Sequence, residues 1–414
     1  MKGTTMINFN KAVKLINQNT QTLPIVELPL IESLGFVLAE KIHTKTPIPA
    51  FKSSAVDGFA VNLKALKSAS ENNPVKLKIQ GIIQAGDTNK YILKQNFTFK
   101  IFTGALVPEN TDAIIMKEDV IEEDDYIIVN KVPEKKENIR AIGEEYPQGK
   151  LVFDKHTVIT PPVISMLAFL GIGKVRVFNK PKVSIIVTGN ELKDYQEKVK
   201  EGEIRDSNGP FLVTALKALG ITPVFVKTIK DDKNLIKDVI QEATGISDII
   251  ITAGGVSVGD YDYVKEASAE VGFNEIYWKI AIKPGKPNYF AKNGNKLLFG
   301  LPGNPVAVAV AFYMLVRFAI FKMMGVKCVP TKYDSAPLLF ALSKKVGRME
   351  FVRGRYINYS DKNVYVEPIM KRESHMIGSI ALANCLIHFP QNKSFLPRGS
   401  IVDVTNVDWF KIGY

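Results

Sequence analysis

Three short loops carry the residues whose types and spacing could do chemistry. The first, Thr252 to Asp260, is a glycine-rich turn between an apolar strand and a helix. Glycines let the backbone approach a ligand closely, and the N–H groups at a helix start attract an anion. The second, Lys283 to Pro287, holds two lysines three residues apart on a proline-stiffened loop, which favours a small oxyanion. The third, Leu301 to Pro305, ends a strand and begins a helix.

Each loop also has a simpler interpretation. The first could be a tight strand-to-helix connection, the second a solvated turn and the third an ordinary helix start. The first matches neither GxxxxGK[ST] nor GxGxxG, so it predicts neither nucleoside triphosphate nor dinucleotide binding. Because ligands of open α/β sheets bind beyond the carboxyl ends of the strands, three such loops on one sheet edge together favour a ligand site.

Acidic residues follow the strands at corresponding places, with Glu191 after the first, Asp231 after the second and Asp262 after the third. Carboxylates there could hold Mg²⁺, which also binds phosphate oxygens. Asp231 could instead cap a helix. The four histidines lack ligand spacing, so zinc is not expected. Since no GxSxG motif occurs and neither cysteine has a local partner, no covalent nucleophile is predicted.

Strand–helix alternation from Pro181 onward predicts the scaffold that positions these loops. Continuous apolar strands between helices are typical of a parallel sheet covered on both faces. A further strand is expected at 277–282, directly before the lysine loop. The expected strands are 183–187, 224–228, 248–252 and 296–301, and the expected helices are 208–219 with Asn208 as cap, 232–244, 261–271 and a long one from Pro305.

Short β-rich runs separated by turn residues lie on either side of this region. The fold class is therefore α/β and β, with a central doubly wound parallel-sheet domain and flanking β domains. A strand at 338–342 is among those expected near the C-terminus. We expect a helical and extended connecting domain at 1–50 plus 147–180, a β-rich domain at 51–146, the α/β domain at 181–330 and a C-terminal β domain at 331–414.

The composition limits the classes of partner that the protein is expected to bind. The net charge is +12, and the stretch from Thr331 to Tyr414 has twelve Lys and Arg against seven Asp and Glu. This basic stretch could be a solvated surface or an anion-binding one. Nucleic acid is not expected, because no RNP motif, zinc-finger spacing or basic arm accompanies the charge. Two cysteines without CxxC spacing fit a reducing cytoplasm.

No membrane segment is expected. The N-terminal residues have no apolar signal-type stretch. The apolar run from Val306 to Phe321 is shorter than the ~20 residues that span a bilayer. A buried helix is the prediction for that run.

Taken in order, the motifs resemble one family, the molybdopterin molybdotransferases, which include the E domain of gephyrin. The resemblance covers nearly the whole chain. The matching stretches are Pro49 to Ala60, Thr103-Gly104-Ala105 with Pro108, Asn138-Ile139-Arg140 with Gly143-Glu144-Glu145, Thr188 to Leu192, Gly254 to Gly259, Lys283 to Pro287 and Leu301 to Pro305.

The resemblance implies an elongated homodimer of four-domain subunits. It implies that molybdate is inserted into adenylyl-molybdopterin with release of AMP, in a Mg²⁺-dependent reaction. The implied catalytic residues are Asp57, Thr103, Glu145, Glu191, Asp231 and Asp262, with Glu191, Asp231 and Asp262 on the metal. The implied substrate-binding residues are Arg140, Gly254, Gly255, Ser257, Lys279, Lys283, Lys286, Pro287, Pro302, Pro305, Arg348 and Ser379. Within this set molybdate is assigned to Lys283, Lys286, Ser257, Arg348 and Ser379, with Arg353 and Ser374 as competitors for the last two places.

Four positions depart from the family pattern. Glu145 stands where Asp is common, Asn190 replaces a frequent Asp, and Val56 and Phe59 replace a usual Met and Tyr. The family's dimer is expected to place Asp57, Thr103 and Arg140 opposite the partner's central domain.

Two rival functions remain at this point. The first is a non-catalytic scaffold that binds cofactor or protein, and the second is the related enzyme that adenylylates molybdopterin. Partner proteins of cofactor synthesis are also possible.

Overall fold

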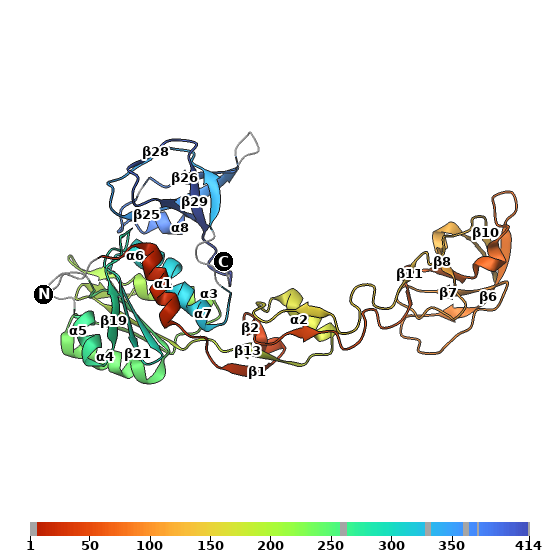
Figure 1. Ribbon diagram of the computed structural model, residues 1–414, viewed down its shortest axis with the longest axis horizontal. Coiled ribbons are helices and arrows are strands. Elements are labelled where there is room, and N and C mark those ends of the chain that lie inside the picture. The colour runs from red at the N-terminus through yellow and green to blue at the C-terminus, as the bar shows by residue number, and fades with distance from the viewer. Residues whose placement is uncertain (1–5, 257–262, 328–332, 359–363, 371, 413–414) are drawn as a thin grey trace. The chain divides into compact units, whose positions relative to one another are not determined.

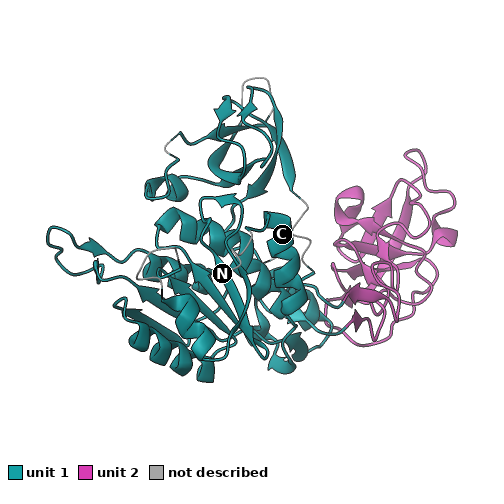
Figure 2. Ribbon diagram, turned by 60° about the vertical axis from the view of Figure 1, so that its left-hand side comes forward, with its two compact units in different colours: residues 1–40, 155–414 teal, residues 41–154 magenta. Residues whose placement is uncertain are grey.

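The structure is a computed structural model that describes residues 6–256, 263–327, 333–358, 364–370 and 372–412. The chain divides into two compact units, one of residues 1–40 with 155–414 and the other of residues 41–154. Figure 2 shows them in separate colours. Each unit has its own sheets and its own apolar cores.

A six-stranded sheet forms the centre of the first unit. Its strands follow the order β17-β14-β18-β22-β21-β19, of which the first four are parallel and the last two join antiparallel. Alternate residues of a strand face opposite sides of a sheet. Accordingly Ile185 lies in one core and Ile186 in the other. The strands are β14 (Val183–Thr188), β17 (Phe225–Ile229), β18 (Ile249–Ala253), β19 (Asn274–Trp278), β21 (Tyr289–Asn293) and β22 (Lys296–Leu301).

Helices cover both faces of this sheet (Figure 1), which confirms the predicted doubly wound domain. One core takes in α1 (Phe9–Asn19), α3 (Asn208–Ala218) and the long helix that begins at Pro305. The other core takes in α4 (Lys233–Ile246) and α5 (Val264–Glu270).

Two helix starts refine the sequence prediction. Asn208 does not cap α3 but is its first residue, and Oδ1 of Asp206 accepts hydrogen bonds from the N–H groups of Asn208 and Gly209 at 2.9 and 3.0 Å. The cap of α4 is Asp232, whose side chain accepts from Leu235 N at 2.8 Å. Asp231 is therefore not the residue that caps α4.

The long helix is a core element, as expected. It consists of α6 (Pro305–Ala311), a π-helical stretch (Phe312–Val316) and α7 (Arg317–Met323). By length and composition it could cross a bilayer, yet 94% of its most apolar window is buried inside the fold. Such burial is typical of a core helix.

The strand expected at 277–282 is broken in two. β19 ends at Trp278, and Lys279 adopts a left-handed φ of 74°. The chain then forms β20 (Ile282–Lys283), which leaves the central sheet and pairs in parallel with β25 (Met349–Asn358). The lysine loop therefore begins at the contact between the central sheet and the C-terminal sheet.

The C-terminal sheet has the order β20-β25-β27-β29-β23, and β26 pairs with β25. The prediction of a strand at 338–342 is wrong. The buried Leu338 and Leu339 lie between two shorter strands, β23 and β24. The remaining elements are β23 (Asp334–Pro337), β24 (Leu342–Ser343), β26 (Val364–Pro368), α8 (Gly378–Ala381), β27 (Cys385–Phe389), β28 (Phe395–Leu396) and β29 (Ile401–Asn406).

A small three-stranded sheet completes the first unit. Its order is β1-β13-β2, with β13 antiparallel to both neighbours. Pro161 begins a nearby helix in the position that favours proline. The elements are β1 (Ile25–Pro29), β2 (Val37–Leu38), α2 (Pro161–Phe169) and β13 (Lys174–Phe178), with a short β15–β16 pair (Leu192–Lys193 and Ile204–Arg205) beside the central sheet.

The second unit is built from strands, as its sequence predicts. Its six-stranded sheet has the order β8-β5-β7-β6-β10-β9, in which only the β6–β7 pair is parallel. Two further pairs, β11 with β4 and β12 with β3, lie outside this sheet. The strands of the whole unit are β3 (Ile42–His43), β4 (Ser53–Ser54), β5 (Gly58–Val61), β6 (Val75–Ile83), β7 (Phe97–Ile101), β8 (Ala113–Met116), β9 (Ile121–Glu123), β10 (Tyr126–Val129), β11 (Ile139–Arg140) and β12 (Leu151–Phe153).

Candidate functional site

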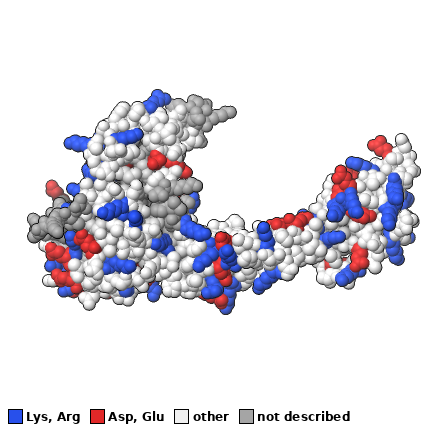
Figure 3. Space-filling model, viewed as in Figure 1, with Lys and Arg blue, Asp and Glu red and all other residues white. Residues whose placement is uncertain are grey.

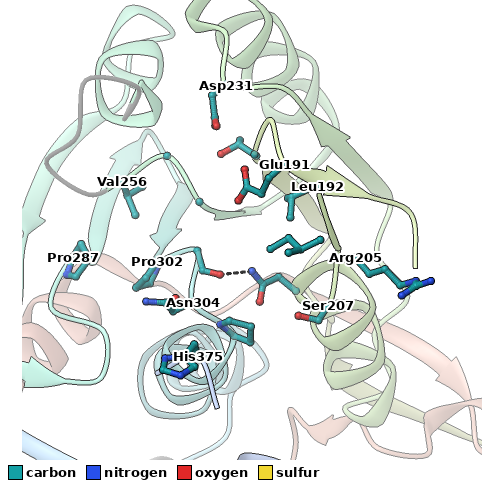
Figure 4. Close-up of a pocket in the computed structure, with 18 residues that line it drawn as sticks. Glu191, Leu192, Arg205, Ser207, Asp231, Val256, Pro287, Pro302, Asn304 and His375 are labelled. Atoms are coloured by element: carbon teal, nitrogen blue, oxygen red, sulfur yellow. Dashed lines mark hydrogen bonds between the residues drawn. The ribbon is translucent and has the colours of Figure 1, made fainter. Parts of the chain in front are cut away.

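A pocket of about 550 Å³ lies at the carboxyl ends of the parallel strands. Its wall includes residues that follow β14, β17, β18 and β22 (Figure 4). The predicted residues that it brings together are Glu191, Asp231, Gly254, Gly255, Pro287, Pro302 and Pro305. Thus the three loops selected from the sequence, including the lysine loop, border one cavity.

Close packing explains the glycine at the start of the first loop. Gly254 has a left-handed φ of +99°, and a Cβ on it would overlap the carbonyl oxygen of Thr188. Its N–H donates to the carbonyl of Leu301 at 3.0 Å, which ties the loop after β18 to the loop after β22. Only glycine meets both requirements without strain, so this position is set by the backbone.

Two carboxylates mark one end of the pocket. Glu191 and Asp231 lie there on separate loops (Figure 4). Oδ1 of Asn190 accepts a hydrogen bond from Asp231 N at 3.2 Å, so Asn190 joins these two loops. Because Mg²⁺ prefers oxygen ligands, this pair is chemically suited to it.

The third predicted metal ligand, Asp262, lies outside the described residues, as does Ser257. Within the described part of the chain, no three His, Cys, Asp or Glu residues gather as a metal-binding group. The structure thus brings together two of the three expected carboxylates.

A second cavity, of about 260 Å³, adjoins the first. The two share Pro287, Pro302 and Asn304. The second is lined by cationic groups from both sides of the contact between the sheets: Lys283 and Lys286 from the lysine loop, and Arg348 and Arg372 from the C-terminal part. Such a set suits an oxyanion, since charge-assisted hydrogen bonds are the stronger kind.

Backbone pairing holds the two sides of this cavity together. Lys283 is in register with Glu350 across the β20–β25 pair. The N–H of Val306, in the first turn of α6, donates to the carbonyl of Ser374 at 3.2 Å. Residues more than sixty positions apart in the sequence therefore meet at fixed places.

Of the two competing serines, Ser374 lines the cation cavity, whereas Ser379 does not. Ser379 is 4% exposed, and its hydroxyl donates to Met376 O at 2.8 Å and accepts from Arg353 Nε at 3.1 Å. Lys279 lines neither cavity, and its Nζ lies 3.7 Å from the centre of the Trp278 ring.

Four predicted residues belong to the second unit. Oδ1 of Asp57 accepts hydrogen bonds from Thr103, from N–H at 2.9 Å and from the hydroxyl at 2.8 Å. These bonds, the backbone one first, lower the pKa of Asp57. Arg140 pairs with Ser53 in a short ladder and is exposed, and Glu145 is exposed as well. On the face drawn in Figure 3, basic and acidic side chains are interspersed over this unit.

Sequence reasoning missed several residues that line the two cavities. Asn208, taken as a helix cap, donates from Nδ2 to Gly303 O at 2.7 Å and keeps Oδ1 without a hydrogen bond from any described residue. The available signal was its position at the start of the expected helix 208–219, after the long loop that follows the expected strand 183–187. The others have no distinctive sequence pattern around them. They are Arg205, at the end of β16, with Ser207 and His375 in the first cavity, and Arg372 and Glu373 in the second.

A doubly wound domain with an acidic pocket joined to a basic cavity is the arrangement of a protein that handles an anionic ligand. Comparison with known families is more specific. Three family models match in order: "MoeA N-terminal region (domain I and II)" at residues 7–171, "Probable molybdopterin binding domain" at 184–322 and "MoeA C-terminal region (domain IV)" at 335–407.

Whole-chain relatives agree with the family models. The molybdopterin molybdenumtransferase of Staphylococcus aureus strain Mu50 is 34% identical, over 96% of this chain and 95% of its own. That of Staphylococcus epidermidis strain ATCC 12228 is 34% identical, over 97% of this chain and 95% of its own. The crystal structure of the molybdopterin biosynthesis MoeA protein from Pyrococcus horikoshii OT3 has a TM-score of 0.83 at 30% identity, and covers 97% of this chain and 100% of its own.

The chain belongs to the MoeA family, whose members are enzymes of molybdenum cofactor biosynthesis. The resemblance inferred from the motifs is thereby confirmed, as is the enzymatic function. The non-catalytic scaffold is not favoured.

Proposed function

We propose that the protein inserts molybdate into adenylyl-molybdopterin and releases AMP, with Mg²⁺ as its metal. The observation that carries this proposal is the direct contact between a carboxylate-lined pocket and a cation-lined cavity, which share Pro287, Pro302 and Asn304. A reaction that joins an oxyanion to a phosphate-bearing organic molecule needs both kinds of site next to each other.

The cation cavity is assigned to molybdate. Lys283, Lys286 and Arg348 would donate charge-assisted hydrogen bonds to its oxygens. Ser374, which lines the cavity, replaces Ser379 as the hydroxyl donor in this proposal. Fixed cations lower the cost of bringing a dianion next to a phosphate group, because they offset the repulsion between the two.

The larger pocket is assigned to adenylyl-molybdopterin. Polar groups on its wall, among them Oδ1 of Asn208 and the side chain of Arg205, would bind the polar edges and phosphates of that substrate. Glu191 and Asp231 would hold Mg²⁺, together with Asp262. When bound, the metal would neutralise phosphate charge during cleavage of the pyrophosphate-type link.

We further propose that two copies form a homodimer. A groove of about 550 Å³ runs along α3, lined by Phe211, Thr214, Ala215 and the C-terminal Trp409 and Phe410, and Phe410 is 79% exposed. Exposed apolar patches of this kind mark interaction surfaces. As the family resemblance implies, Asp57, Thr103 and Arg140 would act on the partner's central pocket. A cytoplasmic location is proposed with it, in keeping with the free, buried thiol of Cys385.

Light scattering tests the dimer. The expected mass is close to twice 46.0 kDa. A monomer that turns over at the full rate would overturn the shared site.

Turnover is tested by mixing the purified protein with adenylyl-molybdopterin, Mg²⁺ and molybdate. The expected result is AMP release together with a molybdenum-containing pterin product, both dependent on molybdate. Substrate binding without AMP release would contradict the proposal. Formation of adenylyl-molybdopterin from ATP and molybdopterin would instead support the adenylylating enzyme.

A further inference from the structure

The cation cavity has a buried carboxylate behind it that neither the family comparison nor the proposed reaction assigns. Glu350 is 1% exposed, on the second residue of β25. Its Oε1 lies 3.5 Å from Nζ of Lys283 and 3.9 Å from Nη1 of Arg372. One oxygen therefore faces two cations that reach the cavity from different parts of the chain.

This carboxylate is unusual in its partners. Neither Oε1 nor Oε2 accepts a hydrogen bond from the described residues, although both are buried. A buried charge is costly unless it is paired. Lys283 and Arg372 form its two ion pairs, and the charges of Arg353 and Lys344 attract it as well. Of these four cations, Lys283 and Arg372 line the cavity assigned to the oxyanion.

Both cations gain from such a partner, and Arg372 has one other anchor, a hydrogen bond from its Nη2 to Ser343 O at 3.2 Å. The side chains of Lys283 and Arg372 are 36% and 21% exposed, and both are long and flexible. Holding such a rotamer-rich side chain in one place costs conformational entropy. Cations that converge on one cavity also repel each other. A negative charge behind them reduces this repulsion and draws both side chains toward the cavity wall.

We infer that Glu350 is a positioning residue of the oxyanion cavity, which holds Lys283 and Arg372 in place for a tetrahedral dianion. It acts through these two side chains, since it does not itself line the cavity. The inference rests on the proposed function of that cavity. The C-terminal domain therefore contributes both Glu350, which anchors the lysine loop, and the cations Arg348 and Arg372.

A double-mutant cycle tests it, with sodium molybdate as the probe and binding to the full-length protein measured by calorimetry. Glu350→Gln removes the charge and keeps the shape, while Glu350→Asp keeps the charge and withdraws it by one methylene. Either change alone combines lost orientation with altered repulsion of the anion. The coupling to Lys283→Ala, rather than the single effect, is therefore the quantity to measure.

In the natural background Lys283→Ala should weaken molybdate binding about tenfold, as loss of one charge-assisted hydrogen bond implies. In the Glu350→Gln or Glu350→Asp background the same change should cost less than about threefold, because the lysine is no longer held. Glu373→Gln is the matched control. It removes a carboxylate that, unlike Glu350, lines the cavity, and in its background Lys283→Ala should again cost about tenfold.

A full tenfold loss in both Glu350 backgrounds overturns the inference and leaves the proposed function standing. Molybdate binding that does not respond to Lys283→Ala in the natural background overturns both. Binding of adenylyl-molybdopterin is measured beside it and should stay unchanged in a folded Glu350 variant. If it is lost in both Glu350 variants, the residue is structural and the inference fails.

Discussion

The acidic pocket and the basic cavity touch each other, yet they arise from the sequence in different ways. The pocket is lined chiefly by loops that follow strands of one sheet, such as those bearing Glu191, Asp231 and Gly254. The cavity needs the C-terminal domain as well, whose loops supply Arg348 and Arg372. A change in the C-terminal sheet should therefore affect oxyanion binding more than it affects the metal end of the pocket.

The largest effect is expected for Lys286→Ala. The side chain lines the cavity, and each charge-assisted hydrogen bond is worth roughly 1.5–3 kcal/mol. The KM for molybdate should rise about ten- to a hundredfold, and excess molybdate should restore cofactor formation. Lys345→Ala is the control, since that exposed lysine does not line the cavity.

The next effect concerns the metal end of the pocket. Asp231→Asn keeps the shape but removes a negative charge, so the Mg²⁺ concentration for half-maximal turnover should rise about tenfold, the equivalent of ~1.4 kcal/mol. The neighbouring Asp232→Asn provides the comparison. It removes the same charge one residue away and keeps a side-chain oxygen that can cap α4, so it should leave both the fold and the Mg²⁺ dependence nearly as they were. Turnover of Asp231→Asn that needs no additional Mg²⁺ would remove Asp231 from the metal site.

The smallest effect is a pH dependence in the C-terminal sheet. His388 is buried on β27, its Nε2 lies 2.7 Å from Thr405 Oγ1, and the Tyr333 ring packs against it. Burial lowers the pKa of His388 from 6.5 to about 3. Below pH 6.5 the unfolded chain binds a proton that the folded chain excludes, so stability falls on acidification.

Between pH 6.5 and about pH 5.5 this should lower the free energy of unfolding by about 1 kcal/mol. Denaturant unfolding of the natural protein and of His388→Gln checks it. The variant should lose that part of the pH dependence. An identical slope for both proteins would show that His388 is not the group responsible.

The difference between the two cavities also explains what could be predicted from sequence. Glu191, Asp231 and the glycine loop follow from strand–helix alternation, because the ends of parallel strands meet at one edge. The lysine loop was found by its residue types. The kink at Lys279, after which β20 pairs with the C-terminal sheet, was not predicted, because no local sequence pattern marks a lysine with a left-handed φ.

The site residues of the C-terminal domain were the hardest to predict from the sequence. Two serines five positions apart, Ser374 and Ser379, could not be separated until the fold showed one lining the cavity and the other bonded to Arg353. Glu350 could not be recognised as a site residue either, because that too required the fold. Its importance depends on pairing with Lys283 across a contact between two sheets, which sequence spacing does not encode.

The most direct test of the account is a crossed titration of two variants, Lys286→Ala and Asp231→Asn, in which AMP release is measured against molybdate and against Mg²⁺ for each. Lys286→Ala should raise the molybdate requirement about ten- to a hundredfold and leave the Mg²⁺ requirement within about threefold of that of the natural protein. Asp231→Asn should show the reverse. If each variant shifts both requirements by the same factor, the two cavities are one undivided site, and the separation of oxyanion from metal is wrong.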